Sequence, residues 1–190
     1  MGLIEVSTAD DSEPLSLEDA KQHLGISTND YDTQVAQLIR EAREHCERCT
    51  QRTLRPSVTR RRIAKCWQDA FKPLRWPPVQ SITSISYYDT GGNLLVLSPG
   101  SYRLIPSGET VACLEWVSGS QVPSLESRSD AIAVEFVTGY GDAESIPETA
   151  KAACKLTLQT LWNEDDAKST DLAERRAMSL LDGLAVGHYR

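Results

Sequence analysis

The sequence lacks long hydrophobic runs and is poor in aromatic residues, and each shortage limits the kind of protein it encodes. No segment approaches the roughly 20 consecutive apolar residues that cross a bilayer, so we expect no membrane association. Residues 1–14 are acidic, whereas a signal peptide is basic and then apolar, so we expect the chain to be cytoplasmic when made. Only 6% of the 190 residues are aromatic, which predicts a core of mainly aliphatic side chains.

Histidines and paired cysteines are also scarce, which argues against a metal site. The chain has three histidines and five cysteines, and its one closely spaced cysteine pair is Cys46 and Cys49. A structural zinc ion takes about four ligands, and no second close pair of cysteine or histidine occurs in the sequence. Both cysteines also continue an apolar helical face that begins at Val35, as small buried side chains do. We therefore interpret them as core residues and keep a metal or redox role as the weaker alternative.

The motifs of the common enzyme classes are missing as well. The sequence has no Gly-x-Ser-x-Gly nucleophile elbow, and it offers few histidines as a general base. The turn at 139–141 contains two glycines but lacks the further glycine and the lysine of a phosphate-binding loop. The sequence therefore predicts no catalytic residue, no metal ligand and no cofactor, and we expect a protein that is not an enzyme.

The hydrophobic pattern has a helical period towards both ends and an alternating period between them. Ser16 and Gly25 mark the ends of a first short helix, because serine caps helix N-termini and glycine ends helices. We expect residues 1–14 to be disordered and residues 15–190 to form a single domain. The predicted class is α+β and mainly α, a helical bundle with a small antiparallel β element inserted. The predicted helices span about 16–24, 30–54, 146–163 and 170–184, and the β region spans about 58–138.

The net charge of −7 is distributed unevenly along the chain. Residues 40–75 contain eleven basic and four acidic residues, whereas residues 1–39 contain one basic and eight acidic residues. A basic segment within an acidic protein indicates either a protein partner of opposite charge or bound DNA. We favour the protein partner and keep a DNA-binding packaging or regulatory protein, acting through 40–65, as the alternative. The candidate interface or DNA-facing cluster is Arg52, Arg55, Arg60, Arg61 and Arg62.

The order of several segments resembles the head-tail connector proteins of tailed bacteriophages. No single segment is diagnostic, but their joint order is hard to obtain by chance, and the resemblance covers about residues 15–190. Adaptor proteins of gene transfer agents are similar. The segments that carry the resemblance are 15–24, 35–43, 50–54, 77–85, 87–89, 102–104, 134–142, 146–148, 180–181 and 189–190.

The resemblance implies a structural protein of the virion neck, encoded by a phage or prophage and assembled in the host cytoplasm. Such an adaptor forms a ring of about twelve copies, docks on the portal protein and offers a surface to the downstream neck or tail completion protein. DNA then passes through the ring without sequence-specific binding. In this family the carboxy-terminal helix tends to reach towards the portal, so the implied docking residues are Leu180, Leu181, Leu184 and Tyr189.

Overall fold

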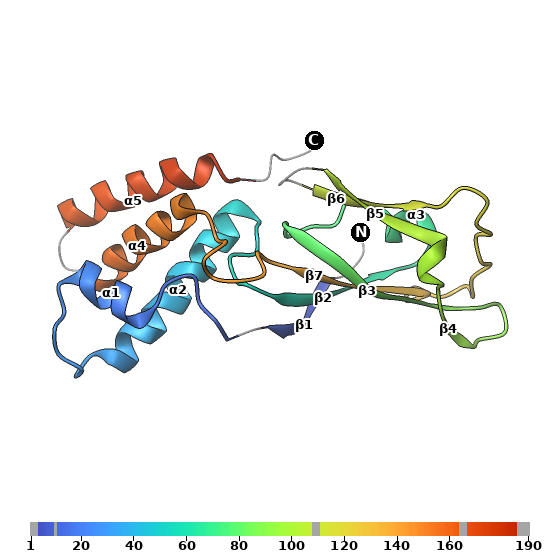
Figure 1. The fold of residues 1–190 in the computed structure, drawn as a ribbon, viewed down its shortest axis with the longest axis horizontal. Coiled ribbons are helices and arrows are strands. Elements are labelled where there is room, and N and C mark those ends of the chain that lie inside the picture. The colour runs from blue at the N-terminus through green and yellow to red at the C-terminus, as the bar shows by residue number, and fades with distance from the viewer. Residues whose placement is uncertain (1–3, 10, 108–110, 164–166, 186–190) are drawn as a thin grey trace. The chain divides into compact units, whose positions relative to one another are not determined.

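The chain forms two compact units, each built from two stretches of sequence (Figure 1). The computed structural model describes all residues except 1–3, 10, 108–110, 164–166 and 186–190. Met1–Asp10 and Ser57–Gly139 make up one unit, which we call the β unit. Asp11–Pro56 and Tyr140–Arg190 make up the other, which we call the helical unit. The expected single domain over 15–190 thus contains most of two compact units.

Four helices pack together in the helical unit. Ser16 and Gly25 bound the first of them as predicted: the Ser16 hydroxyl accepts a hydrogen bond from the Asp19 amide at 3.0 Å, and Gly25 adopts a φ of 72°. The second helix ends before its predicted limit, because Gln51 takes a left-handed conformation with a φ of 56°. The helices are α1 (Leu17–Leu24), α2 (Asp32–Thr50), α4 (Glu148–Trp162) and α5 (Ala167–Asp182).

Aliphatic side chains and two cysteines fill the core of the helical unit. Val35, Ile39 and Cys46 line the inner face of α2 at helical spacing, and all three are buried. They meet Cys154 and other buried residues of α4. Cys49 is half-buried against the same core, so the interpretation of the Cys46 and Cys49 pair as core residues is confirmed.

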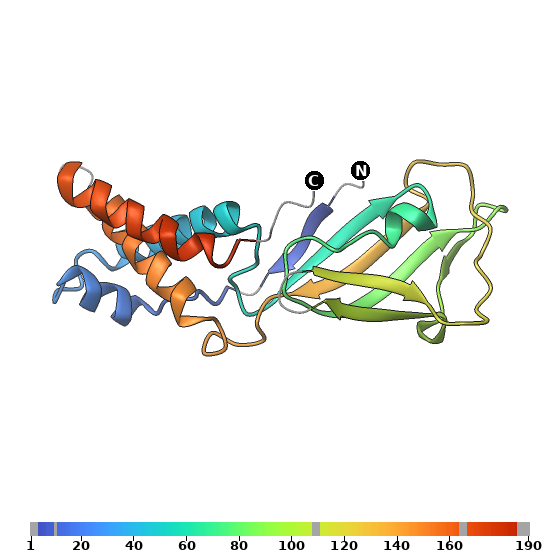
Figure 2. The same ribbon diagram turned by 90° about the horizontal axis from the view of Figure 1, so that it is seen from above.

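A five-stranded antiparallel sheet and a two-stranded sheet form the β unit (Figure 2). The spatial order in the large sheet is β1-β2-β7-β3-β4, and every neighbouring pair is antiparallel. A short helix, α3 (Trp67–Ala70), and a 3-10 turn at Pro99–Ser101 complete the unit. The strands are β1 (Ile4–Ala9), β2 (Val58–Ala64), β3 (Val79–Tyr88), β4 (Leu94–Val96), β5 (Tyr102–Ser107), β6 (Val111–Trp116) and β7 (Ile132–Thr138).

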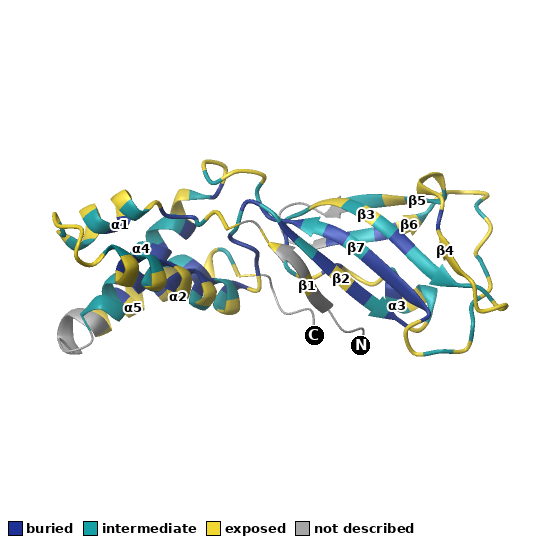
Figure 3. Ribbon diagram, turned by 90° about the horizontal axis from the view of Figure 1, so that it is seen from below, coloured by how far each residue is buried: buried dark blue, intermediate teal, exposed yellow. Residues whose placement is uncertain are grey.

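Strand β7 lies at the centre of the large sheet and anchors the second core. Ile132, Val134 and Phe136 alternate along it and are fully buried, because side chains two residues apart in a strand share one face. They pack with Ile85 of β3 and Leu114 of β6, between the two sheets. Figure 3 shows this burial as the dark blue length of β7.

The fold is therefore mixed α and β, but the mainly helical layout with a small β insertion is not confirmed. The β unit is a complete unit with its own core, and it includes a strand that the sequence analysis did not predict. Ile4–Ala9, within the segment expected to be disordered, forms the edge strand β1 beside β2. A register shift between Val6 and Thr8 interrupts its pairing, which weakens the alternating pattern that reveals strands.

Candidate functional site

The structure separates the predicted arginine cluster into buried and exposed members. In strand β2, Arg60 and Arg62 are buried on the core face, whereas Arg61 between them is exposed. Successive side chains of a strand point to opposite faces, so three adjacent arginines cannot form one patch here. The expectation of one interface or DNA-facing cluster is therefore corrected for Arg60 and Arg62, whose side chains are buried.

The two buried arginines bind groups of the β unit itself. Arg62 donates a hydrogen bond from Nη2 to the Pro73 carbonyl at 2.6 Å, and its Nη1 donates to the Lys72 carbonyl. Arg60 donates from Nε to the Thr138 hydroxyl at 3.2 Å and stacks over the Trp76 ring at 4.7 Å. Burial and, to a smaller extent, the nearby positive charge of Arg75 lower the pKa of Arg62 to about 10.

The remaining two members of the cluster lie in the helical unit. Arg52 is buried and donates from Nε to the Leu184 carbonyl at 2.6 Å. Arg55 is partly buried, and its Nη2 lies 3.9 Å from a carboxylate oxygen of Glu13. Arg61 is therefore the one exposed member of the five. The structure argues against DNA binding through all five arginines, because contacts with phosphate groups need exposed charges.

An arginine outside the predicted cluster organises a larger ionic network. Arg43, on the buried side of α2, contacts the carboxylates of Glu13 at 2.7 Å, Glu47 at 2.8 Å and Glu44 at 3.3 Å. Glu47 in turn accepts a hydrogen bond from the Leu54 amide at 2.7 Å. The network connects the segment before α1 and the segment after α2 to the middle of α2.

The predicted portal-docking residues have unequal access to solvent. Leu181 is buried in the core of the helical unit, and Leu180 and Leu184 are half-buried against that core. Tyr189 lies outside the described residues. The burial of Leu181 suits a residue that holds α5 in place. Exposed apolar side chains on α5 are found instead at Leu172 and Met178, which the sequence analysis did not select.

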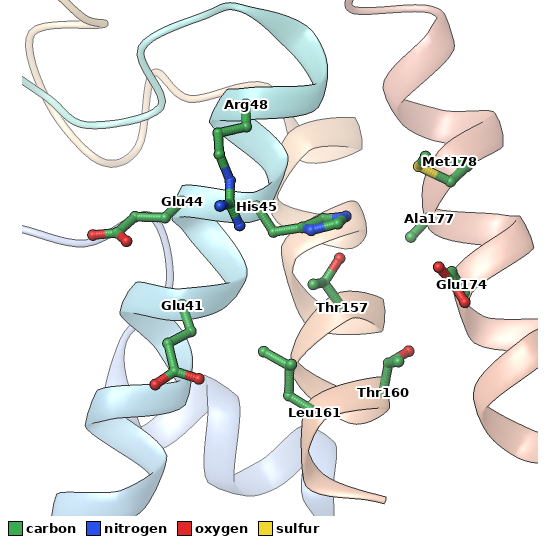
Figure 4. A pocket seen from close by; sticks show the side chains of 10 residues that line it. All are labelled: Glu41, Glu44, His45, Arg48, Thr157, Thr160, Leu161, Glu174, Ala177 and Met178. Atoms are coloured by element: carbon green, nitrogen blue, oxygen red, sulfur yellow. The ribbon is translucent and has the colours of Figure 1, made fainter. Parts of the chain in front are cut away.

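A groove of about 360 Å³ opens among α2, α4 and α5 of the helical unit (Figure 4). His45 extends from α2 towards α4, and Glu174 and Met178 extend from α5. The remaining lining residues are Glu41, Glu44, Arg48, Thr157, Thr160, Leu161 and Ala177. Across the described ranges, no group of three or more histidine, cysteine or acidic side chains is placed to hold a metal ion.

The β unit carries an open aromatic depression of about 570 Å³. Phe71 stacks on Trp116 with ring centroids 4.7 Å apart, and Trp67 meets Trp116 edge to face at 5.1 Å. Gln68 and Lys72 complete the lining. The depression is an apolar surface with a polar rim, a composition typical of protein contact sites.

Strand β4 is an exposed apolar element of the β unit. Leu94, Leu95 and Val96 are consecutive, and 59%, 41% and 69% of their surfaces are exposed. Single exposed apolar residues are ordinary, but a contiguous exposed set marks an interaction site. None of the helices in the described part of the chain is both long and apolar enough to span a membrane.

Comparison with known proteins confirms the resemblance that the sequence analysis identified. Residues 14–82 match the family model described as phage gp6-like head-tail connector protein. No curated protein matches the chain significantly. Among solved structures, the chain is similar to one in the virion of a native gene transfer agent particle, with a TM-score of 0.78 and 19% identity. That match covers 99% of this chain and 97% of the other.

Two further structures describe the neck of the gene transfer agent particle. A chain in the neck of the empty particle, computed with C6 symmetry, matches with a TM-score of 0.79 and 18% identity. A chain in the neck of the native particle, computed with C12 symmetry, matches with a TM-score of 0.77 and 19% identity. Each match covers 99% of this chain and 97% of the other, so the shared fold includes both units.

Proposed function

We propose that this protein is a head-tail connector subunit, a structural component of the virion neck that joins a phage head to its tail. One observation carries the proposal: nearly the whole length of the chain shares its fold with a chain of a gene transfer agent neck. The match of residues 14–82 to the head-tail connector family supports the same role from sequence. The protein acts in this role by assembly and not by catalysis.

The proposed assembly is a ring of about twelve copies. The similar chains come from neck structures computed with C6 and C12 symmetry, which supports a closed rotational arrangement. In such a ring each copy uses two unlike surfaces, one towards each neighbour. The net charge of −7 suits a channel through which DNA passes without binding, because like charges repel.

We further propose that the carboxy-terminal end of the helical unit docks on the portal protein, and that another surface receives the next neck or tail component. Leu180, Leu184 and Tyr189 are the proposed portal contacts, while Leu181 holds α5 against the core. The half-buried state of Leu180 and Leu184 supports this division, because contact residues need solvent-accessible surface before the partner arrives.

A measurement of assembly on the portal tests this function. The full-length protein is mixed with purified portal rings from the same phage, and particle masses are measured by mass photometry. We expect the mass of the portal to rise by about twelve subunits, because copies that bind the same ring are brought together. Portal rings whose mass stays unchanged at saturating protein would contradict the proposal. Bovine serum albumin at the same concentration controls for non-specific adsorption.

A further inference from the structure

We propose that strand β4 joins neighbouring copies in the ring by pairing with strand β1 of the next copy. The inference rests on the proposed function and adds the surfaces through which the subunits meet. Strands β1 and β4 are the two edge strands of the large sheet. In the described part of the chain, β1 pairs with β2 alone and β4 pairs with β3 alone.

Edge strands are protected from association by short length, by charged residues, by proline or by a bulge. Strand β4 is short, at three residues, but the edge that it forms lacks the other three protections. Residues 90–98 contain no charged residue and no proline, and β4 pairs with β3 over three consecutive positions without a register shift. Leu94, Leu95 and Val96 are all exposed at this edge, as the yellow colour of β4 in Figure 3 shows. An exposed apolar edge without charge, proline or a bulge favours the addition of a further strand.

The exposure of β4 is built into a well-ordered hairpin. The Asp89 carboxylate accepts hydrogen bonds from the amides of Gly91 at 2.8 Å and Asn93 at 2.9 Å, which fixes the turn. Beyond β4, Leu97 is buried in the core, and its amide donates to the Ile85 carbonyl at 2.7 Å. The strand is therefore held in an extended conformation before a partner binds, which reduces the entropy lost on pairing.

Strand β1 forms the free edge on the other side of the sheet. It contains Glu5 and a register shift between Val6 and Thr8, and the shift leaves residues 4–6 as a regular stretch of three, the same length as β4. Val6 lies in this stretch and exposes 57% of its surface. Four antiparallel steps separate β1 from β4, so the two strands have the same polarity within the sheet.

A second copy suits these two edges better than other occupants. Contacts between unlike edges of one sheet are head-to-tail, and repeated around an axis they close into a ring. If two β4 strands paired with each other instead, the contact would have two-fold symmetry and would end at a dimer. The portal protein is another possible occupant, and a crosslink to the portal would identify it.

The first test replaces exposed residues of β4 with lysine. Leu94→Lys and Val96→Lys introduce charge where no core packing is disturbed, so the thermal unfolding temperature should stay within about 2 °C of wild type. Val122→Lys is the matched control, since Val122 exposes 54% of its surface in a loop of the same unit. We expect the β4 variants to lose the ring on the portal in mass photometry, and the control to keep it. Rings of normal mass with both β4 variants would overturn the inference while the proposed function survives.

The second test identifies the partner strand by cysteine crosslinking. Val6→Cys and Val96→Cys are combined in one chain, assembled on the portal and oxidised with oxidised glutathione. We expect a ladder of crosslinked multimers from the double variant and none from either single variant. The single variants also show whether any of the five native cysteines forms crosslinks. Dimers from Val96→Cys alone would indicate pairing of two β4 strands, and a crosslink to the portal would indicate that protein as the occupant; either result overturns the inference. Wild-type protein that forms no ring would overturn the proposed function as well.

Discussion

Replacing Arg43 with alanine is expected to destabilise the protein by about 3–5 kcal/mol. The change removes the partner of Glu13 and Glu47, whose side chains are 16% and 12% exposed. Two carboxylates would then stay largely buried without their cation, and breaking a buried ion pair from one side carries this large cost. Urea denaturation followed by circular dichroism measures the change in the free energy of unfolding.

Arg40→Ala provides the matched control for this prediction. Arg40 lies one turn earlier on α2 and is exposed, so its replacement should change the free energy of unfolding by no more than about 0.5 kcal/mol. Equal effects at the two positions would show that the ionic network around Arg43 contributes no more than a surface charge does.

The adjacent residues Arg61 and Arg62 are expected to differ sharply when each is replaced with alanine. Arg62→Ala removes the guanidinium that binds the carbonyls of Lys72 and Pro73 and leaves a cavity beside the core, so we expect a loss of about 3 kcal/mol. Arg61→Ala alters the exposed face of the same strand, and we expect a change within about 0.5 kcal/mol. Thermal unfolding of the two variants, measured side by side, gives the comparison.

This pair of variants also tests how the arginines are assigned. If Arg62→Ala were as stable as wild type and Arg61→Ala were not, the alternation of side chains along β2 would be reversed, and Arg62 would be the solvent-facing residue. Loss of portal binding by Arg61→Ala with unchanged stability would instead assign a contact role to the exposed member of the original cluster.

The helical half of the fold was predictable because its signals are local. Ser16 and Gly25 bound α1 through capping contacts that involve neighbouring residues alone. The apolar spacing from Val35 to Cys46 likewise predicted the buried face of α2. The predicted limits of α2 and α5 were less accurate. Helix α2 ends at Gln51, which takes a left-handed conformation although it is not a glycine, so the sequence contains no signal for this end.

The β unit and the buried charges were harder to predict because both depend on distant partners. Strand β1 pairs with β2, and the paired residues lie 49 to 58 positions apart in the sequence. Arg60, Arg61 and Arg62 were interpreted as one surface. A β region was expected from residue 58, and in a strand alternate side chains face the core, so this signal could have separated Arg61 from the other two. Arg43 could have been found, because it follows Ile39 by four residues and so lies on the same helical face.

Electron cryomicroscopy of the protein assembled on portal rings tests the central claim most directly. The account predicts a closed ring of about twelve copies, seated coaxially on the portal, in which β4 of each copy lies beside β1 of the next. A reconstruction with single copies scattered over the portal, or with no added density, would contradict it.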